Sequence, residues 1–161
     1  MNSFRTLSYQ EWSEAESKVI RTILEQTVSD EELFVRKLVN ATVIRNQCFE
    51  HTSHESEDGQ RQFIYMKPFQ EMELQPYGSP IKHALFEYCD IAPVLAADWH
   101  YWERGQFNRR EPLRPAYQTL ELAQLLLDHY YVERGHTYEH VYSVLDLDRR
   151  KVNLFLKGVD V

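Results

Sequence analysis

The predicted fold depends most on the stretch TYEHVYSVLDLDRRKVNLFLKG, residues 137–158. Thr137 is a favourable N-cap for a short helix over Tyr138–Leu145, because its hydroxyl can accept a hydrogen bond from a free backbone N–H of the first turn. Asp148 is an equally favourable N-cap for a helix over 149–157, and a glycine follows that helix. The stretch therefore predicts two short helices joined by a tight turn.

Apolar residues stand where they would hold these two helices together, at Val141, Leu145, Leu147, Val152 and Phe155. Two short helices packed in this way after a longer one resemble the tri-helical helix-turn-helix unit of DNA-binding proteins. The resemblance covers residues 137–158 and implies that the second helix reads duplex DNA. Because one short recognition helix contacts few bases, it also implies a homodimer.

Hydrogen-bond donors fill the remaining positions of the second predicted helix. Arginine reads guanine edges, asparagine can read adenine, and lysine mostly holds phosphate. The predicted DNA-contact residues are Arg149, Arg150, Lys151, Asn153 and Lys157. The alternative interpretation of the same segment is a structural helical hairpin with a solvated basic face.

Further helices are predicted upstream of this segment. Tyr117–Arg134 is rich in leucine and tyrosine on most sides, as expected of a central core helix. Val94–Trp102 predicts another helix, which Gly105 could end in a left-handed cap. Ser79 and Pro80 mark a further helix start, since proline is tolerated in the first turn.

Two capping boxes predict helices near the N-terminus. Ser8 and Glu11 have the spacing at which each side chain satisfies a free backbone N–H, and apolar residues at helical spacing predict a helix over Tyr9–Thr27. Ser29 and Glu32 repeat the pattern and open a second helix.

The only predicted β-structure is a short hairpin. β-Branched residues follow Asn40, where a strand is about as favourable as continued helix, and Asp58-Gly59 is a turn signal. We therefore expect a hairpin between Thr42–Glu50 and Arg61–Met72. The overall expectation is a mainly α, compact multi-helix domain over 1–161 with this one hairpin and the C-terminal helix-turn-helix-like unit. A subdivision into an acidic part, 1–105, and a helix-turn-helix-like part, 115–161, is possible.

Aromatic and arginine residues alternate between positions 99 and 117, a mixture that suits either base stacking or a protein interface. A second nucleic-acid or partner surface is therefore predicted at Trp102, Arg104, Arg109, Arg110 and Arg114. The alternative is that the rings are core and the arginines pair with acids such as Glu103 and Glu111.

Cys48, His51 and His54 lie three residues apart, but a zinc site needs a fourth ligand and no second Cys/His pair has suitable spacing. Nucleotide-binding, zinc-protease and esterase motifs are also absent from the sequence. We therefore expect no metal, no cofactor and no enzymatic activity.

The chain of 161 residues has a net charge of −7, and its acidity is concentrated near the N-terminus. Residues 1–60 hold 6 Lys and Arg against 11 Asp and Glu, whereas residues 99–161 hold 9 of each. No apolar run approaches the ~20 residues needed to cross a bilayer, and Met1–Gln10 has no signal-peptide organisation. These features predict a cytoplasmic protein without membrane contact.

Two functions fit the sequence best, and a third alternative is a small enzyme or metal-binding protein built around the predicted hairpin and its histidines. The first is a small DNA-associated or transcription-regulatory protein that reads duplex DNA through its C-terminus. The alternative is a protein-interaction module, an adaptor or an inhibitor, that binds no nucleic acid and uses its acidic helices and aromatic-arginine segment as the contact surface.

Overall fold

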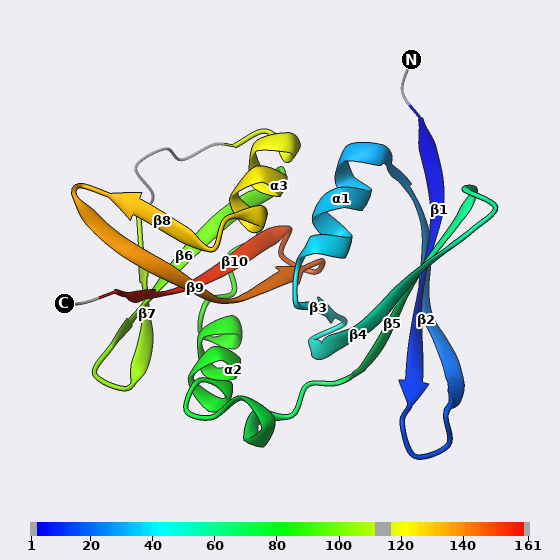
Figure 1. Ribbon diagram of the computed structural model, residues 1–161, viewed down its shortest axis with the longest axis horizontal. Helices are drawn as coiled ribbons and strands as arrows, with labels where there is room; N and C mark the ends of the chain where they lie inside the picture. Colours follow the sequence, from blue (N-terminus) through cyan, green and yellow to red (C-terminus); the bar gives the residue numbers. More distant parts are fainter. Residues whose placement is uncertain (1–2, 112–116, 160–161) are drawn as a thin grey trace.

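The computed structural model describes residues 3–111 and 117–159, and this part of the chain is dominated by one mixed β-sheet (Figure 1). Strands account for 53% of the residues and helices for 21%, so the expectation of a mainly α fold is wrong. The sheet order is β2-β1-β5-β4-β3-β9-β10-β6-β7, and β8 also pairs with β9. In chain order the elements are β1 (Phe4–Ser13), β2 (Lys18–Ser29), α1 (Asp30–Leu38), β3 (Ala41–Ile44), β4 (Gln47–Glu57), β5 (Arg61–Pro68), the 3-10 helix η1 (Glu71–Leu74), α2 (Gly78–Glu87), β6 (Ala96–Glu103), β7 (Gln106–Arg110), α3 (Thr119–Leu127), β8 (Tyr130–Glu133), β9 (His136–Asp146) and β10 (Lys151–Gly158).

The same succession of elements occurs twice. We call β1-β2-α1-β3-β4-β5 the first repeat and β6-β7-α3-β8-β9-β10 the second repeat. In each, the first strand pairs in parallel with the last over six residues, Thr6–Glu11 with Arg61–Met66 and Ala96–Tyr101 with Lys151–Leu156. Equivalent elements also have equal lengths. Helices α1 and α3 have 9 residues each, β3 and β8 have 4, β4 and β9 have 11, and β5 and β10 have 8.

Fine details of the backbone also repeat. Thr52 in β4 and Val141 in β9 are each bulged out of the ladder, at the same position of their strands. The preceding hairpins turn through residues with positive φ, Arg45-Asn46 in the first repeat and Arg134-Gly135 in the second. Bulges and turn types are specific features of a strand pair, so their recurrence shows that the two repeats share one backbone plan.

Helices cover the two repeats unequally. On one face of the second repeat's sheet, α1 and α3 bury Val35 and Leu122 against Trp99 and Leu154. On its other face lies α2, whose Ile81 packs in a separate cluster with Phe107 and Phe155. The first repeat has α1 on the side facing the second repeat. On its opposite side α2 reaches Val43 of β3 and Cys48 of β4, but no described helix lies over β1, β2 and β5 (Figure 1).

The predicted C-terminal helix-turn-helix unit is wrong, because its two segments are β9 and β10. Successive side chains of a strand point to opposite faces. In β10, Val152 and Leu154 join the cluster under α1 and α3, whereas Phe155 joins the cluster under α2. Both faces of β10 are buried, so apolar residues occur on both sides and do not alternate with exposed polar ones, and their spacing also fits a helix.

The predicted helix over Tyr9–Thr27 is also wrong, since this segment forms β1 and β2. Ser8 and Glu11 are strand residues, and their spacing imitates a capping box by chance. The second capping signal is correct. The Ser29 side chain accepts a hydrogen bond from the N–H of Glu32, and α1 begins at Asp30.

Between residues 94 and 134 the chain forms more strand than expected. The predicted helix over Val94–Trp102 lies mostly in β6, and Gly105 belongs to the β6–β7 turn. The predicted helix over Tyr117–Arg134 is confined to α3, after which Tyr130–Glu133 pairs with β9. Leucines gave these segments a helical pattern, but burial in a sheet decided the conformation.

The remaining local predictions agree better with the structure. Helix α2 begins at Gly78, one residue before the predicted cap Ser79. The predicted hairpin is present as β4 and β5, with β3 forming a second hairpin with β4. No helix in the described part of the chain is both long and apolar enough to cross a membrane.

We expect the shared core to be the most sensitive part of this fold. Leu154 is fully buried, so Leu154→Ala should lower the free energy of unfolding by ~2–5 kcal/mol through lost burial and a residual cavity. Leu127→Ala, at a position 63% exposed, should change it by less than ~0.5 kcal/mol. Urea denaturation of the two variants checks this, and equal effects would contradict the assigned core.

Candidate functional site

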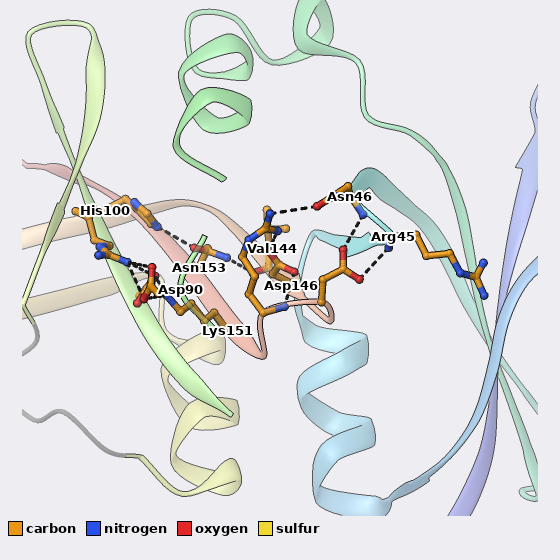
Figure 2. A network of polar contacts seen from close by, with 12 residues as sticks. Arg45, Asn46, Asp90, His100, Val144, Asp146, Lys151 and Asn153 are labelled. Carbon is orange, nitrogen blue, oxygen red and sulfur yellow. Dashed lines mark hydrogen bonds and ion pairs between the residues drawn. The ribbon is translucent and has the colours of Figure 1, made fainter. Parts of the chain in front are cut away.

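Three of the five predicted DNA-contact residues, Arg149, Lys151 and Asn153, lie in a polar network between the start of β10 and the β3–β4 turn (Figure 2). Arg149 donates to Asp146 Oδ2 at 2.8 Å and to Asn46 Oδ1 at 3.1 Å. The side chain of Asp146 is 2% exposed and that of Arg149 is 13% exposed. Because removing either partner would leave a buried charge, this ion pair is structural.

Lys151 is buried in a second part of the same network. Its ammonium group donates to Asp90 and lies 3.2 Å from Asp98 Oδ2. Arg109 binds the same two carboxylates, at 3.1 Å and 3.3 Å. The hydrogen bond from Lys151 lowers the pKa of Asp90 to about 2, so the Asp90 carboxylate stays charged at neutral pH.

Asn153 connects the network to the centre of the sheet. Its side-chain amide donates to the Val144 carbonyl at 3.4 Å, and its Oδ1 lies 2.9 Å from His100 Nε2. The His100 ring stacks on Phe155, and burial lowers its pKa. The cavity that these side chains leave beneath α2 has a volume of about 10 Å³. It has room for one water molecule at most, so it is not a substrate pocket.

The other two predicted contacts differ in their environment. Arg150 is exposed and donates to the Pro93 carbonyl at 3.1 Å, and Lys157 is exposed near the end of β10. Of the five cationic and amide side chains, only these two therefore face solvent in the described structure. DNA binding remains a prediction, but residues 137–158 offer no recognition helix for it.

Asp148 holds the two repeats together at the β3–β4 turn. Its carboxylate accepts hydrogen bonds from the backbone N–H groups of Arg45, at 2.9 Å, and Asn46, at 2.6 Å. Nearby, β3 pairs in parallel with β9, and the Leu147 N–H donates to the Val43 carbonyl at 3.0 Å. The predicted helix cap is therefore a clamp across the junction (Figure 2).

The aromatic-arginine segment is mostly interior. Trp102 packs edge-on against Tyr77, and Arg110 pairs with Glu103 and lies over the Tyr101 ring. The alternative in which rings are core and arginines pair with acids fits this segment best. Arg104 is exposed in the β6–β7 turn with a φ of 51°, and Arg114 lies outside the described residues.

Cys48 does not join the two histidines near it in sequence. Cys48 lies in the core under α2, where burial raises the pKa of its thiol to about 12. His51 contacts Thr42 Oγ1 at 2.7 Å and His54 at 3.4 Å. In the described part of the chain no group of three or more His, Cys, Asp or Glu side chains could hold a metal ion.

A surface that sequence reasoning missed lies on the first repeat. We define the outer face as the side of the β4-β5-β1-β2 sheet opposite α1. Leu7, Tyr9 and Ile64 pack with α1 in the core, so their strand neighbours point to the outer face. These are Ser8, Gln10 and Trp12 of β1, Arg61, Phe63 and Tyr65 of β5, Ser53, Glu55 and Glu57 of β4, and Val19, Thr22 and Glu25 of β2.

The outer face combines aromatic rings with carboxylates. Trp12 and Tyr65 are half-buried and meet edge-on with ring centroids 6.0 Å apart, and Phe63 stacks beside Tyr65. The Tyr65 hydroxyl donates to exposed Glu55, which together with burial raises the tyrosine pKa. Arg61 lies over the Phe63 ring. An aromatic row with a polar rim is typical of protein-binding surfaces.

Sequence signals for this face were present but ambiguous. Phe63 and Tyr65 alternate with core residues in the predicted hairpin, whereas Trp12 was assigned to a helix. Comparison with family models, curated proteins and solved structures gave no match to this chain.

The junction clamp predicts a graded loss of stability. Asp148→Ala removes the acceptor of two backbone N–H groups and should lower the free energy of unfolding by ~1–2 kcal/mol, because hydrogen bonds to charged groups are strong but this turn is exposed. Asp148→Asn retains one acceptor oxygen and should lower the free energy of unfolding by an intermediate amount. Urea denaturation measures both, with exposed Glu139→Ala as the control; no loss in Asp148→Ala would contradict the clamp.

His51 should make stability depend on pH. Burial and His54 lower its pKa to about 3, whereas the unfolded chain should titrate near 6.5. Between these values the unfolded state binds more protons, so the free energy of unfolding should fall as pH drops from 6.5 towards 3, by at most ~1.4 kcal/mol per pH unit from this group. The same decline in His51→Gln as in the wild type, measured by urea denaturation at several pH values, would contradict this.

Proposed function

We propose that the protein is a protein-binding module, an adaptor or inhibitor, that binds its partner through the outer face of the first repeat. The observation that carries this proposal is the unequal cover of two equivalent sheet faces. In the second repeat the face is buried beneath α2, whereas in the first repeat no described helix covers β1, β2 and β5 (Figure 1). Trp12 and Tyr65 stay partly exposed there, although Phe63 between them and Arg61 is only 7% exposed. A cytoplasmic location is part of the proposal.

The chemistry of the outer face supports a protein ligand. Trp12, Phe63 and Tyr65 form a contiguous aromatic row, and tryptophan and tyrosine are the side chains that most often dominate binding energy at interfaces. Glu55 and Glu57 at its rim are exposed, as rim residues of interfaces usually are. Such carboxylates repel nucleic-acid phosphates, so the face favours the protein alternative over DNA.

Tyr65→Glu should abolish partner binding, because it places a charge at the centre of the aromatic row. Affinity purification from nuclease-treated extract of the source cells should recover a stoichiometric protein with the wild-type chain and lose it with this variant. Circular dichroism and thermal denaturation should show that the variant folds.

The matched control is Tyr130→Glu, which alters an exposed tyrosine of β8 in the second repeat and should leave recovery unchanged. The double variant Glu55→Arg/Glu57→Arg changes only exposed rim residues and should weaken recovery without affecting folding. A partner retained equally by Tyr65→Glu and the rim variant would refute the outer face as the binding surface.

A further inference from the structure

We propose that the partner presents an amphipathic α-helix with basic flanks, which lies across the outer face as α2 lies across the second repeat. This inference rests on the proposed function and specifies the kind of partner. It follows from the repeat itself, because the structure already contains one example of the occupant that this backbone plan accepts.

In that example, α2 uses a narrow apolar stripe. Ile81, Ala84 and Leu85, spaced as one face of a helix, are 0%, 3% and 3% exposed and pack on the sheet. Lys82 and His83 point away from this stripe and are exposed. A helix with small and branched side chains at these three positions can therefore pack closely on such a sheet face.

Aromatic side chains that pack in the α2 cluster of the second repeat recur at equivalent positions of the first repeat. Trp12 directly follows the last residue of β1 that pairs with β5, and Trp102 directly follows the last residue of β6 that pairs with β10. Tyr65 and Phe155 are each the fifth residue of the last strand. Trp102 and Phe155 lie in the cluster that packs against α2, so Trp12 and Tyr65 are placed to receive a second helix.

The charged positions indicate the flanks of the partner helix. In both repeats the last strand begins with a cation opposite a carboxylate, Lys151 with Asp146 and Arg61 with Glu57. The position of buried Val144 in the second repeat is taken by exposed Glu55 in the first. The outer face carries Glu25, Glu55 and Glu57 against one cation, Arg61. The face under α2 carries Asp98 and Asp146 against two cations, Lys151 and Arg109. The outer face is therefore the more acidic of the two, and lysine or arginine beside the apolar stripe would complement it.

The same carboxylates disfavour a second copy of the chain as the occupant. In a two-fold symmetric contact the same patch meets itself, so Glu55 and Glu57 would approach identical groups. Like charges brought together at an interface oppose association. A basic helix removes this conflict.

The test uses the 161-residue chain, labelled with ¹⁵N, and two synthetic helical peptides. Both peptides carry isoleucine, alanine and leucine at the α2 spacing. In one the flanking positions are lysine, and in the other they are glutamate. NMR titration follows the Trp12 indole N–H and the backbone N–H groups of β4 and β5.

The lysine peptide should shift outer-face signals saturably, and the glutamate peptide should bind about tenfold more weakly or worse, because its charges meet the rim carboxylates. Glu55→Lys/Glu57→Lys should reverse this preference, and Tyr65→Ala should weaken both peptides. Tyr130→Ala, in β8 of the second repeat, should leave the titration unchanged.

Three results would overturn the inference: no saturable shifts with the lysine peptide, shifts confined to other surfaces, or equal binding of the two peptides. Self-association through the outer face, seen as concentration-dependent sedimentation that Tyr65→Glu abolishes, would also overturn it in favour of a second copy. If partner recovery still depends on Tyr65 while the peptides fail to bind, the protein-binding function stands and only the helical partner is refuted.

Discussion

The parallel pairing of β3 with β9 is the interaction on which the rest of the structure depends. Three residue pairs, from Ala41 with Val144 to Val43 with Asp146, join two repeats into one sheet. So short a ladder needs support, which comes from Asp148 at the β3–β4 turn and from α1. This helix contributes Leu33 to the core of the first repeat and Val35 to that of the second, so the junction is covered by apolar side chains as well as hydrogen-bonded.

This joint determines which sheet faces are covered. The chain leaves β5 at one side of the joint and returns as β6 in the second repeat. The connecting helix α2 therefore covers the second repeat and the adjoining β3 and start of β4, and leaves β1, β2 and β5 without a helix on this side. Two copies of one backbone plan thus receive different environments. The buried network of Lys151, Asp98 and Arg109 belongs to the covered copy, where charges must be paired because water is excluded.

Local signals in the sequence were sufficient where one short interaction decides the structure. The Ser29 cap and the Asp58-Gly59 turn both act within a few residues, and both were predicted correctly. Burial on both faces removed the strand signature from β10, because Phe155 is as buried as Leu154. The outer face could not be predicted either, since Trp12 and Tyr65 are brought together by the pairing of β1 with β5. Residues so far apart in the chain share no local pattern.

The repeat explains why the outer face retains aromatic residues without cover. Solvent would normally favour polar side chains on an open sheet face, and β4 follows that rule with Ser53, Glu55 and Glu57. The neighbouring strands β5 and β1 follow it only in part: they carry Arg61 and Gln10, but Trp12 and Tyr65 keep the aromatic character of the positions that pack with α2 in the second repeat. On a face that is polar at one edge and aromatic at its centre, water hydrates the edge favourably but not the aromatic rings. Such a face is most stable when a ligand covers the centre and leaves the edge hydrated.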